Sequence, residues 1–266
     1  MELRRSAVLL LVLGACSGKA KAVEDARSHA GSASDSGSIQ TDAQSGQGQA
    51  KGEGDVQVRV EWKDVPAVAR ASAGRTACGT PRAAQVSPSP TWGIPEVFVA
   101  IDVEKKVAPT TRPRIVLDQC ALEPRVAVAG TTIAIASAAD APAKLGIHKA
   151  GQLPLGGALG GTPKPIYLPI AGHEVEVPLE PRGIYQLQIA TSDGFDPENA
   201  WIVSADTPYV AITEGNGQTT FRDLPVGTYA VHAWLPPRAG QDQRIAHGTV
   251  TVAASDLTEV TLNLAP

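Results

Sequence analysis

The chain has 266 residues, of which 43% are hydrophobic and 19% are charged, and its formal net charge is −4. This mildly acidic balance, without any cluster of Lys or Arg, makes nucleic acid and anionic membrane surfaces poor partners. Aromatic residues make up only 4%, whereas 21 prolines and 26 glycines interrupt the chain, which is typical of short strands joined by turns.

Residues 1–15 have the features of a signal peptide. Arg4 and Arg5 form a positive start, and the apolar run at 7–13 is too short for a membrane span, which needs about 20 residues. Two small residues then precede Cys16, an order that resembles a bacterial lipobox and predicts cleavage and lipidation at Cys16. The alternative is an ordinary secretory signal with a chance cysteine. The absence of Asp after Cys16 favours the outer membrane over the inner one, so we expect a lipid-anchored protein of the cell envelope or periplasm.

Residues 16–54 form the next segment, which is rich in Gly, Ser, Ala, Gln and Asp and has almost no large apolar side chain. Such a composition cannot bury enough apolar surface to offset the entropy of ordering the chain. As a flexible coil it would span roughly 35 Å. We therefore predict a disordered tether that holds a folded body away from the membrane.

Three cysteines are present in the chain. Lipidation of Cys16 leaves Cys78 and Cys120 as the two thiols of an oxidising compartment, which favours a disulfide between them. The bridge would close a loop of about 43 residues, worth about 4 kcal/mol in loop entropy. Free or metal-binding thiols are the alternative.

The remainder is predicted to be all β, because apolar side chains recur at every second position in many segments. Two stretches lack this alternation: 63–95, and the Gly- and Pro-rich stretch 151–169, which is expected to be an irregular loop because its glycine doublets lack the spacing of a phosphate-binding motif. The alternating segments are Val56–Trp62, Val97–Val103, Val126–Val128, Ile133–Ile135, Val175–Val177, Tyr185–Ile189, Val250–Val252 and Val260–Leu264.

The segment 208–266 contains the pattern T-x-x-x-G-x-x-x-F-x-x-L-P-x-G-x-Y, which ends at Tyr229. This pattern resembles the carboxypeptidase regulatory-like (prealbumin-like) domain, a noncatalytic β-sandwich in which that tyrosine locks a turn into the core. Such domains usually have two strands before the pattern. The resemblance therefore predicts one discontinuous domain made of residues 55–108 and 206–266.

The intervening residues 112–205 resemble another family. Cys78-Gly79 upstream, Leu117-Asp118-Gln119-Cys120, Gly183-Ile184-Tyr185 and Trp201-Ile202-Val203 follow the order seen in the cupredoxin-like proteins often labelled methylamine utilization proteins. The resemblance implies a Greek-key sandwich of the blue-copper type joined to a regulatory-like module, so the expected fold combines two β-sandwiches.

The copper ligands that this family implies are missing. Blue copper needs two imidazoles and a thiolate, often with a weak thioether. The corresponding positions are Leu145, Ser192, Phe195 and Glu198, and only the second histidine of the H-N-x-H segment remains, as His148. The only methionine of the chain is its first residue. We therefore expect a degenerate cupredoxin-like domain that has lost its copper, with no metal site and no cofactor.

Two weaker candidates for chemistry remain. Asp193, Asp196 and Glu198 crowd the former ligand loop, where oxygen ligands suit Ca²⁺, although an acidic surface loop explains them as well. His232 and His247 lie in strand-like segments and could meet across a sheet as a weak metal pair, although structural or exposed histidines are the alternative.

No catalytic motif is present: the sequence has no GxSxG, HExxH or P-loop. The sequence thus predicts a protein that is not an enzyme and that presents a two-domain β body to an envelope protein or saccharide partner. The alternative function is electron transfer or copper binding through unconventional ligands.

Overall fold

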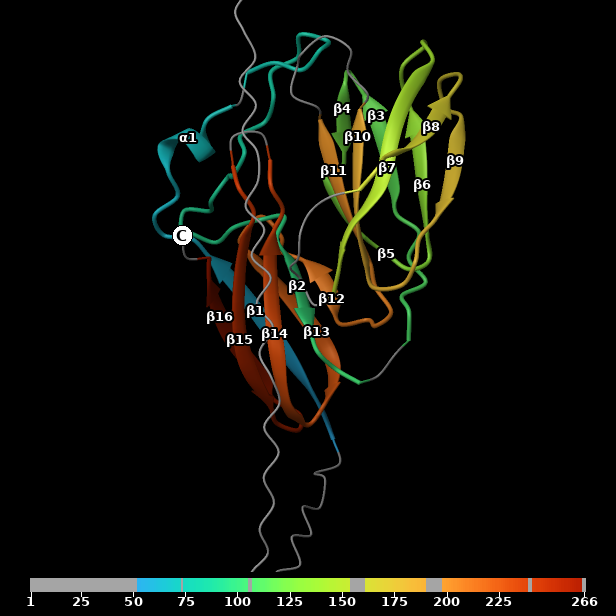
Figure 1. Cartoon of the computed structure of the whole chain (residues 1–266). Helices are drawn as coiled ribbons and strands as arrows, with labels where there is room; N and C mark the ends of the chain where they lie inside the picture. The colour runs from blue at the N-terminus through green and yellow to red at the C-terminus, as the bar shows by residue number, and fades with distance from the viewer. Residues whose placement is uncertain are drawn as a thin grey trace, which may run out of the picture. The chain divides into compact units, whose positions relative to one another are not determined.

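The computed structural model describes residues 52–72, 74–104, 107–153, 161–189, 198–238 and 241–264, all within one compact unit from Gly48 to Pro266. These residues form sixteen strands and one short helix, in four sheets (Figure 1). The predicted all-β sandwich fold is confirmed. The predicted signal peptide, Cys16 and residues 16–51 of the predicted tether lie outside the described residues. The end of the predicted tether is wrong, because Glu53 and Gly54 already belong to β1.

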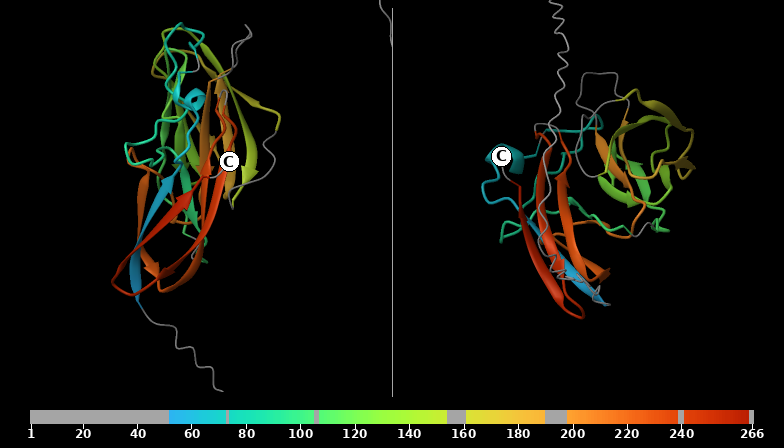
Figure 2. Two further views of the ribbon diagram at one scale, coloured as in Figure 1. Left: turned by 90° about the vertical axis from the view of Figure 1, so that its left-hand side faces the viewer. Right: turned by 60° about the horizontal axis from the view of Figure 1, so that its bottom comes forward.

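A three-stranded sheet has the order β13-β1-β16. Strand β1 (Glu53–Glu61) is central, antiparallel to β13 (Gln218–Pro225) and parallel to β16 (Leu257–Asn263). Figure 2 shows this blue strand running beside the red end of the chain. Val56, Val58 and Val60 are fully buried, as their alternation predicts.

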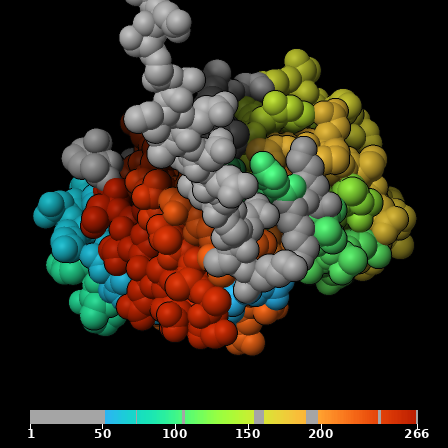
Figure 3. Space-filling model, turned by 90° about the horizontal axis from the view of Figure 1, so that it is seen from below, coloured from blue at the N-terminus to red at the C-terminus, as the bar shows by residue number. Residues whose placement is uncertain are grey.

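A four-stranded sheet covers the buried face of the first one. Its order is β12-β2-β14-β15, and the core between the two sheets includes Val58, Val99, Val231 and Leu262. The later strands of this pair of sheets, coloured red, occupy a broad part of the face in Figure 3. The strands are β12 (Val210–Ile212), β2 (Phe98–Ile101), β14 (Gly227–Leu235) and β15 (Arg244–Val252).

The middle of the chain forms a second pair of sheets around its own core, which includes Ile115, Ile135, Leu145 and Leu187. One sheet has the order β5-β11-β10-β7-β8 and the other β4-β3-β6-β9. The strands are β3 (Arg114–Asp118), β4 (Ala121–Glu123), β5 (Val126–Ala129), β6 (Thr132–Ser137), β7 (Ala143–Gln152), β8 (Lys164–Leu168), β9 (Glu174–Pro178), β10 (Gly183–Ile189) and β11 (Asn199–Ser204).

The prediction of an irregular loop over 151–169 is wrong at its end, where β8 forms. Ile166 and Leu168 of β8 are buried while Tyr167 is exposed, so the alternation is present but short. Pro165 is compatible with this strand because β8 is at the edge of its sheet, where one backbone N–H is not needed. Residues 154–160 lie outside the described ranges.

A third apolar cluster joins strands from both pairs of sheets. Trp234 of β14 stacks on Phe98 of β2 with ring centroids 5.4 Å apart, and Trp201 of β11 meets Trp234 edge-on, also at 5.4 Å. Val126 of β5 and Val210 of β12 belong to the same cluster. The two bodies therefore share a packed apolar contact, and the segments at its border can form a site between them.

The segment 63–95 is irregular, as predicted, apart from helix α1 (Ala67–Arg70). A disulfide joins Cys78 in this segment to Cys120, with Cα atoms 5.6 Å apart. The pairing predicted from the cysteine count is confirmed. The bond fixes the irregular segment to the turn between β3 and β4.

Candidate functional site

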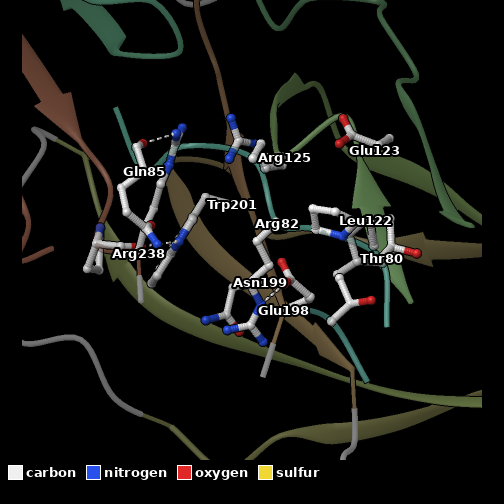
Figure 4. Close-up of a pocket in the computed structure, with 15 residues that line it drawn as sticks. Thr80, Arg82, Gln85, Leu122, Glu123, Arg125, Glu198, Asn199, Trp201 and Arg238 are labelled. Carbon is white, nitrogen blue, oxygen red and sulfur yellow. Dashed lines mark hydrogen bonds and ion pairs between the residues drawn. The ribbon is translucent and has the colours of Figure 1, made fainter. Parts of the chain in front are cut away.

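A pocket of about 220 Å³ lies beside the disulfide. Its walls come from the irregular segment at 76–85, from β4, from the start of β11 and from the loop after β14 (Figure 4). Both apolar and polar side chains line it. The charged lining residues are Arg82, Glu123, Arg125, Glu198 and Arg238.

The disulfide and two threonines hold one wall in place. Thr76 Oγ1 donates a hydrogen bond to the carbonyl oxygen of Gln119 at 3.4 Å, and Thr80 Oγ1 lies 3.4 Å from Gln119 Oε1. Gln119 immediately precedes Cys120, so these contacts and the Cys78–Cys120 bond attach the irregular segment to the same turn. A segment without regular strands is therefore fixed well enough to present ordered side chains.

Two arginines share one carboxylate at the back of the pocket. Arg125 Nη2 donates to Glu96 Oε2 at 2.9 Å, and Arg238 Nη2 forms an ion pair with the same oxygen. Arg238 also donates to the carbonyl oxygen of Gln85, beside which it lies in Figure 4. Burial lowers the pKa of Arg238 and Glu96 opposes this shift. Since arginine stays protonated in proteins, the result is a fixed, nearly buried guanidinium.

A third arginine, Arg82, is paired with a carboxylate at the start of β11. Arg82 and Glu198 form an ion pair, with side chains 10% and 21% exposed, and they face each other in Figure 4. Glu198 comes immediately before β11 and its backbone oxygen accepts from Ile189 N. The sequence assigned Glu198 to a former thioether position, and the structure places its carboxylate at the pocket, bound to a guanidinium.

Glu123 contributes an acidic group at the rim. Burial raises the pKa of its carboxyl, Arg125 opposes that shift, and Glu96 and Glu198 add to it. With Glu96 behind the lining, three guanidiniums and three carboxylates gather here, so the formal charges of the cluster cancel. Such a cluster offers many hydrogen-bond donors and acceptors without selecting for an anion.

Trp201 and Asn199, both in β11, complete the wall. The indole Nε1 of Trp201 donates to the carbonyl oxygen of Pro237 at 3.1 Å, which ties β11 to the loop after β14. The side-chain oxygen of Asn199 is buried and has no hydrogen-bond partner among the described residues. An acceptor of this kind favours a ligand that brings its own donor.

The positions that the cupredoxin-like resemblance assigns to copper ligands do not form one cluster in the described residues. Leu145 is fully buried in the core of the middle sheets, whereas His148, three residues along the same strand, is half-buried outside that core. Desolvation lowers the pKa of His148. Ser192 and Phe195 lie outside the described residues. So do Asp193 and Asp196 of the calcium alternative, whereas its third member, Glu198, is paired with Arg82.

The other histidine candidates do meet. His232 and His247 are opposite each other on β14 and β15, with Nδ1 atoms 2.8 Å apart. Within the part of the chain that the structure describes, no group of three or more His, Cys, Asp or Glu side chains is arranged to hold a metal ion.

The pocket itself was missed at the level of sequence. Arg82, Arg125 and Arg238 come from three distant segments and belong to no motif. The only useful signal was the cysteine pair, because it predicted that the segment at 78 lies next to 120.

Taken together, fold and site define an all-β protein with a small pocket of mixed polar and apolar lining at the border of two packed bodies. No protein-family model matches the chain, and no curated protein or solved structure shows significant similarity to it. Over the described ranges, no helix is both long and apolar enough to cross a membrane.

Proposed function

We propose that this protein is a noncatalytic, lipid-anchored protein of the bacterial envelope, and that its pocket beside the disulfide binds a small saccharide unit. The observation that carries the proposal is the charge-balanced ring of arginines and carboxylates around the pocket. These side chains hold one another in place, so few rotamers need to be ordered when a ligand binds.

The size and charge of the pocket support a sugar ring as ligand. A volume of about 220 Å³ is below the roughly 300–1,000 Å³ of sites for drug-sized ligands, so the ligand is small. A neutral cluster gives no advantage to an anion, whereas hydroxyl groups both donate and accept hydrogen bonds. Leu122 and Trp201 also line the pocket, and because they are only 1% and 2% exposed, the polar groups carry the recognition of the ligand.

The state of the carboxylates supports binding rather than catalysis. Glycoside hydrolysis requires one free carboxylic acid and one carboxylate that acts on water or on the sugar. Glu96 and Glu198 are each engaged by guanidiniums. Only Glu123 has a raised pKa without a direct ion pair among the described contacts. This leaves one free carboxyl where two are required.

The envelope location rests on the sequence around Cys16. Labelling of growing bacteria with radioactive palmitate tests it directly. The wild-type chain is expected to incorporate label and fractionate with the outer membrane, whereas Cys16→Ser incorporates none. Label that persists in Cys16→Ser contradicts the anchor but leaves the pocket proposal intact.

Binding is tested by adding monosaccharides from bacterial envelope glycans to the purified chain and following its amide signals by NMR. Shifts are expected at β4 and at the start of β11. Asn199→Ala should weaken binding at least tenfold, because it removes a buried acceptor. Asn216→Ala, in an exposed turn, is the control. Shifts confined to other parts of the chain contradict the proposal.

The two-family organisation is also our proposal. Strands from 53–101 and 210–263 form one pair of sheets, and strands from 114–204 form the other. This division supports a regulatory-like body combined with an inserted cupredoxin-like body. An experimental structure that places both within known folds of those two families, by strand order, is the test.

A further inference from the structure

A pair of histidines lies on the face of the four-stranded sheet that is turned away from the three-stranded sheet. The register of β14 and β15 sets His232 directly opposite His247, and the two Nδ1 atoms are 2.8 Å apart. Val231 and Ala233, the neighbours of His232 in β14, belong to the sandwich core. Since alternate side chains of a strand point to opposite faces, the histidine pair lies away from that core.

A carboxylate orients the first of these rings. Asp102, which follows β2, places its Oδ2 3.1 Å from Nε2 of His232. An ionised carboxylate only accepts hydrogen bonds, so Nε2 of His232 carries the proton. In the neutral ring, Nδ1 then has a free lone pair aimed at His247. When both rings are neutral, the hydrogen atom between them therefore belongs to Nδ1 of His247.

From this arrangement we propose that His232 and His247 form a binding site for a divalent transition-metal ion, in which the ion replaces the hydrogen atom between the two Nδ1 atoms. His247 then carries its proton on Nε2 instead. A carboxylate that holds the far nitrogen of a ligating imidazole is the usual outer partner of a metal-bound histidine, and Asp102 has that position.

The distances allow this exchange with a small movement. Metal–imidazole bonds of about 2.0–2.1 Å at a tetrahedral angle require the nitrogens to be about 3.3 Å apart. The rings must therefore separate by about 0.5 Å. His247 is exposed and can make this movement, while His232, only 14% exposed in its side chain, stays held by Asp102.

The donor set determines the class of ion. Imidazole nitrogens suit Ni²⁺, Cu²⁺ and Zn²⁺, whereas Mg²⁺ prefers oxygen ligands. Two protein ligands leave the remaining positions to water. This arrangement describes an open, exchangeable surface site, separate from the pocket beside the disulfide, and it does not depend on the proposed saccharide binding.

The experiment is calorimetric titration of the purified full-length chain, made without a histidine tag, with NiCl₂ and ZnCl₂. One ion per chain is expected, and MgCl₂ should produce no binding heat. His232→Ala and His247→Ala should each weaken binding at least tenfold. His173→Ala, at an exposed position between β8 and β9, is the matched control and should leave binding unchanged.

The variant Asp102→Asn tests whether Asp102 orients the His232 ring without itself coordinating the ion. Its side chain does not reach the ion, so it should weaken binding about 10-fold or more while the ratio of one ion per chain is kept. Urea unfolding of each variant verifies that it is folded. Absence of Ni²⁺ and Zn²⁺ binding, or equal affinity in the wild type and His247→Ala, overturns the proposal.

Discussion

Arg238 and Glu96 form an ion pair at the border of the two β bodies although 142 residues separate them in the chain. Arg125 binds the same carboxylate from the middle part of the chain. One side chain, Glu96, therefore connects the loop after β14 to the segment between β4 and β5. This connection gives the first of four predictions on stability.

Glu96→Gln is expected to destabilise the protein by about 1–3 kcal/mol, the usual range for a lost hydrogen bond to a charged group. The change leaves the guanidiniums of Arg125 and Arg238 without their shared anion. Urea unfolding measures the loss. Glu259→Gln, on an exposed position of β16, should stay within about 0.5 kcal/mol of the wild type. Equal effects of the two substitutions would contradict a role for the cluster.

Replacing both Cys78 and Cys120 with Ser is expected to lower the free energy of unfolding by about 4 kcal/mol. The two cysteines are 42 positions apart in sequence, and without the bond the unfolded chain between them gains conformational entropy. The pocket wall at 76–85 depends on the same bond, so its amides should exchange faster with solvent. Hydrogen exchange and urea unfolding measure the two effects. A stability loss without faster exchange at 76–85 would contradict the link between the bond and the pocket.

Gly217→Ala is expected to cost more than 1 kcal/mol. Gly217 has a φ of 78°, and an added Cβ would lie 2.4 Å from the Cα atom of Gly93. Gly215→Ala, in the same turn, provides a matched control because nothing lies within 4 Å of its added Cβ. Thermal unfolding of both variants provides the comparison. The prediction fails if the two melting temperatures are the same.

Glu123→Gln is expected to stabilise the protein at neutral pH. Burial raises the pKa of Glu123 above its ordinary value of 4.5, so the folded state prefers the protonated form. That contribution is complete below the unfolded pKa and is lost as pH rises through the folded pKa. Glutamine, which stays neutral, avoids the loss.

The measurement is urea unfolding of wild type and Glu123→Gln between pH 3 and pH 7. The advantage of the variant should vanish at the acid end and be constant above the raised pKa. Glu259→Gln controls for the change in net charge. A stability difference that does not vary with pH would show that Glu123 does not titrate differently in the folded state.

Local alternation predicted the strands well where it was strong. The alternation predicts that Val56, Val58 and Val60 share one buried face, and all three are buried in the structure. It failed at β8, where only Ile166 and Leu168 alternate and a proline stands between Lys164 and Ile166. A run this short is also compatible with a loop, and only its pairing with β7 decides that it is a strand.

The site was less accessible to sequence reasoning than the fold. His232 and His247 could be suggested as neighbours because both lie in strand-like segments, and the structure pairs these segments as β14 and β15. Asp102 could not, since its distance to His232 depends on the pairing of β2 with β14. The arginines of the pocket depend in the same way on contacts between distant segments, and single-chain patterns do not encode such contacts.

The parallel pairing of β1 with β16 has a consequence for biogenesis. Among the described strands β1 comes first in sequence, yet its neighbours β13 and β16 lie more than 150 residues further along the chain. Non-local pairings of this kind form slowly. Strand β1 therefore has no sheet partner until the segment up to β16 is available, whereas the strands of 114–204 pair only with one another. A truncated chain that lacks β16 is expected to leave one edge of β1 unpaired and to aggregate more readily than the whole chain.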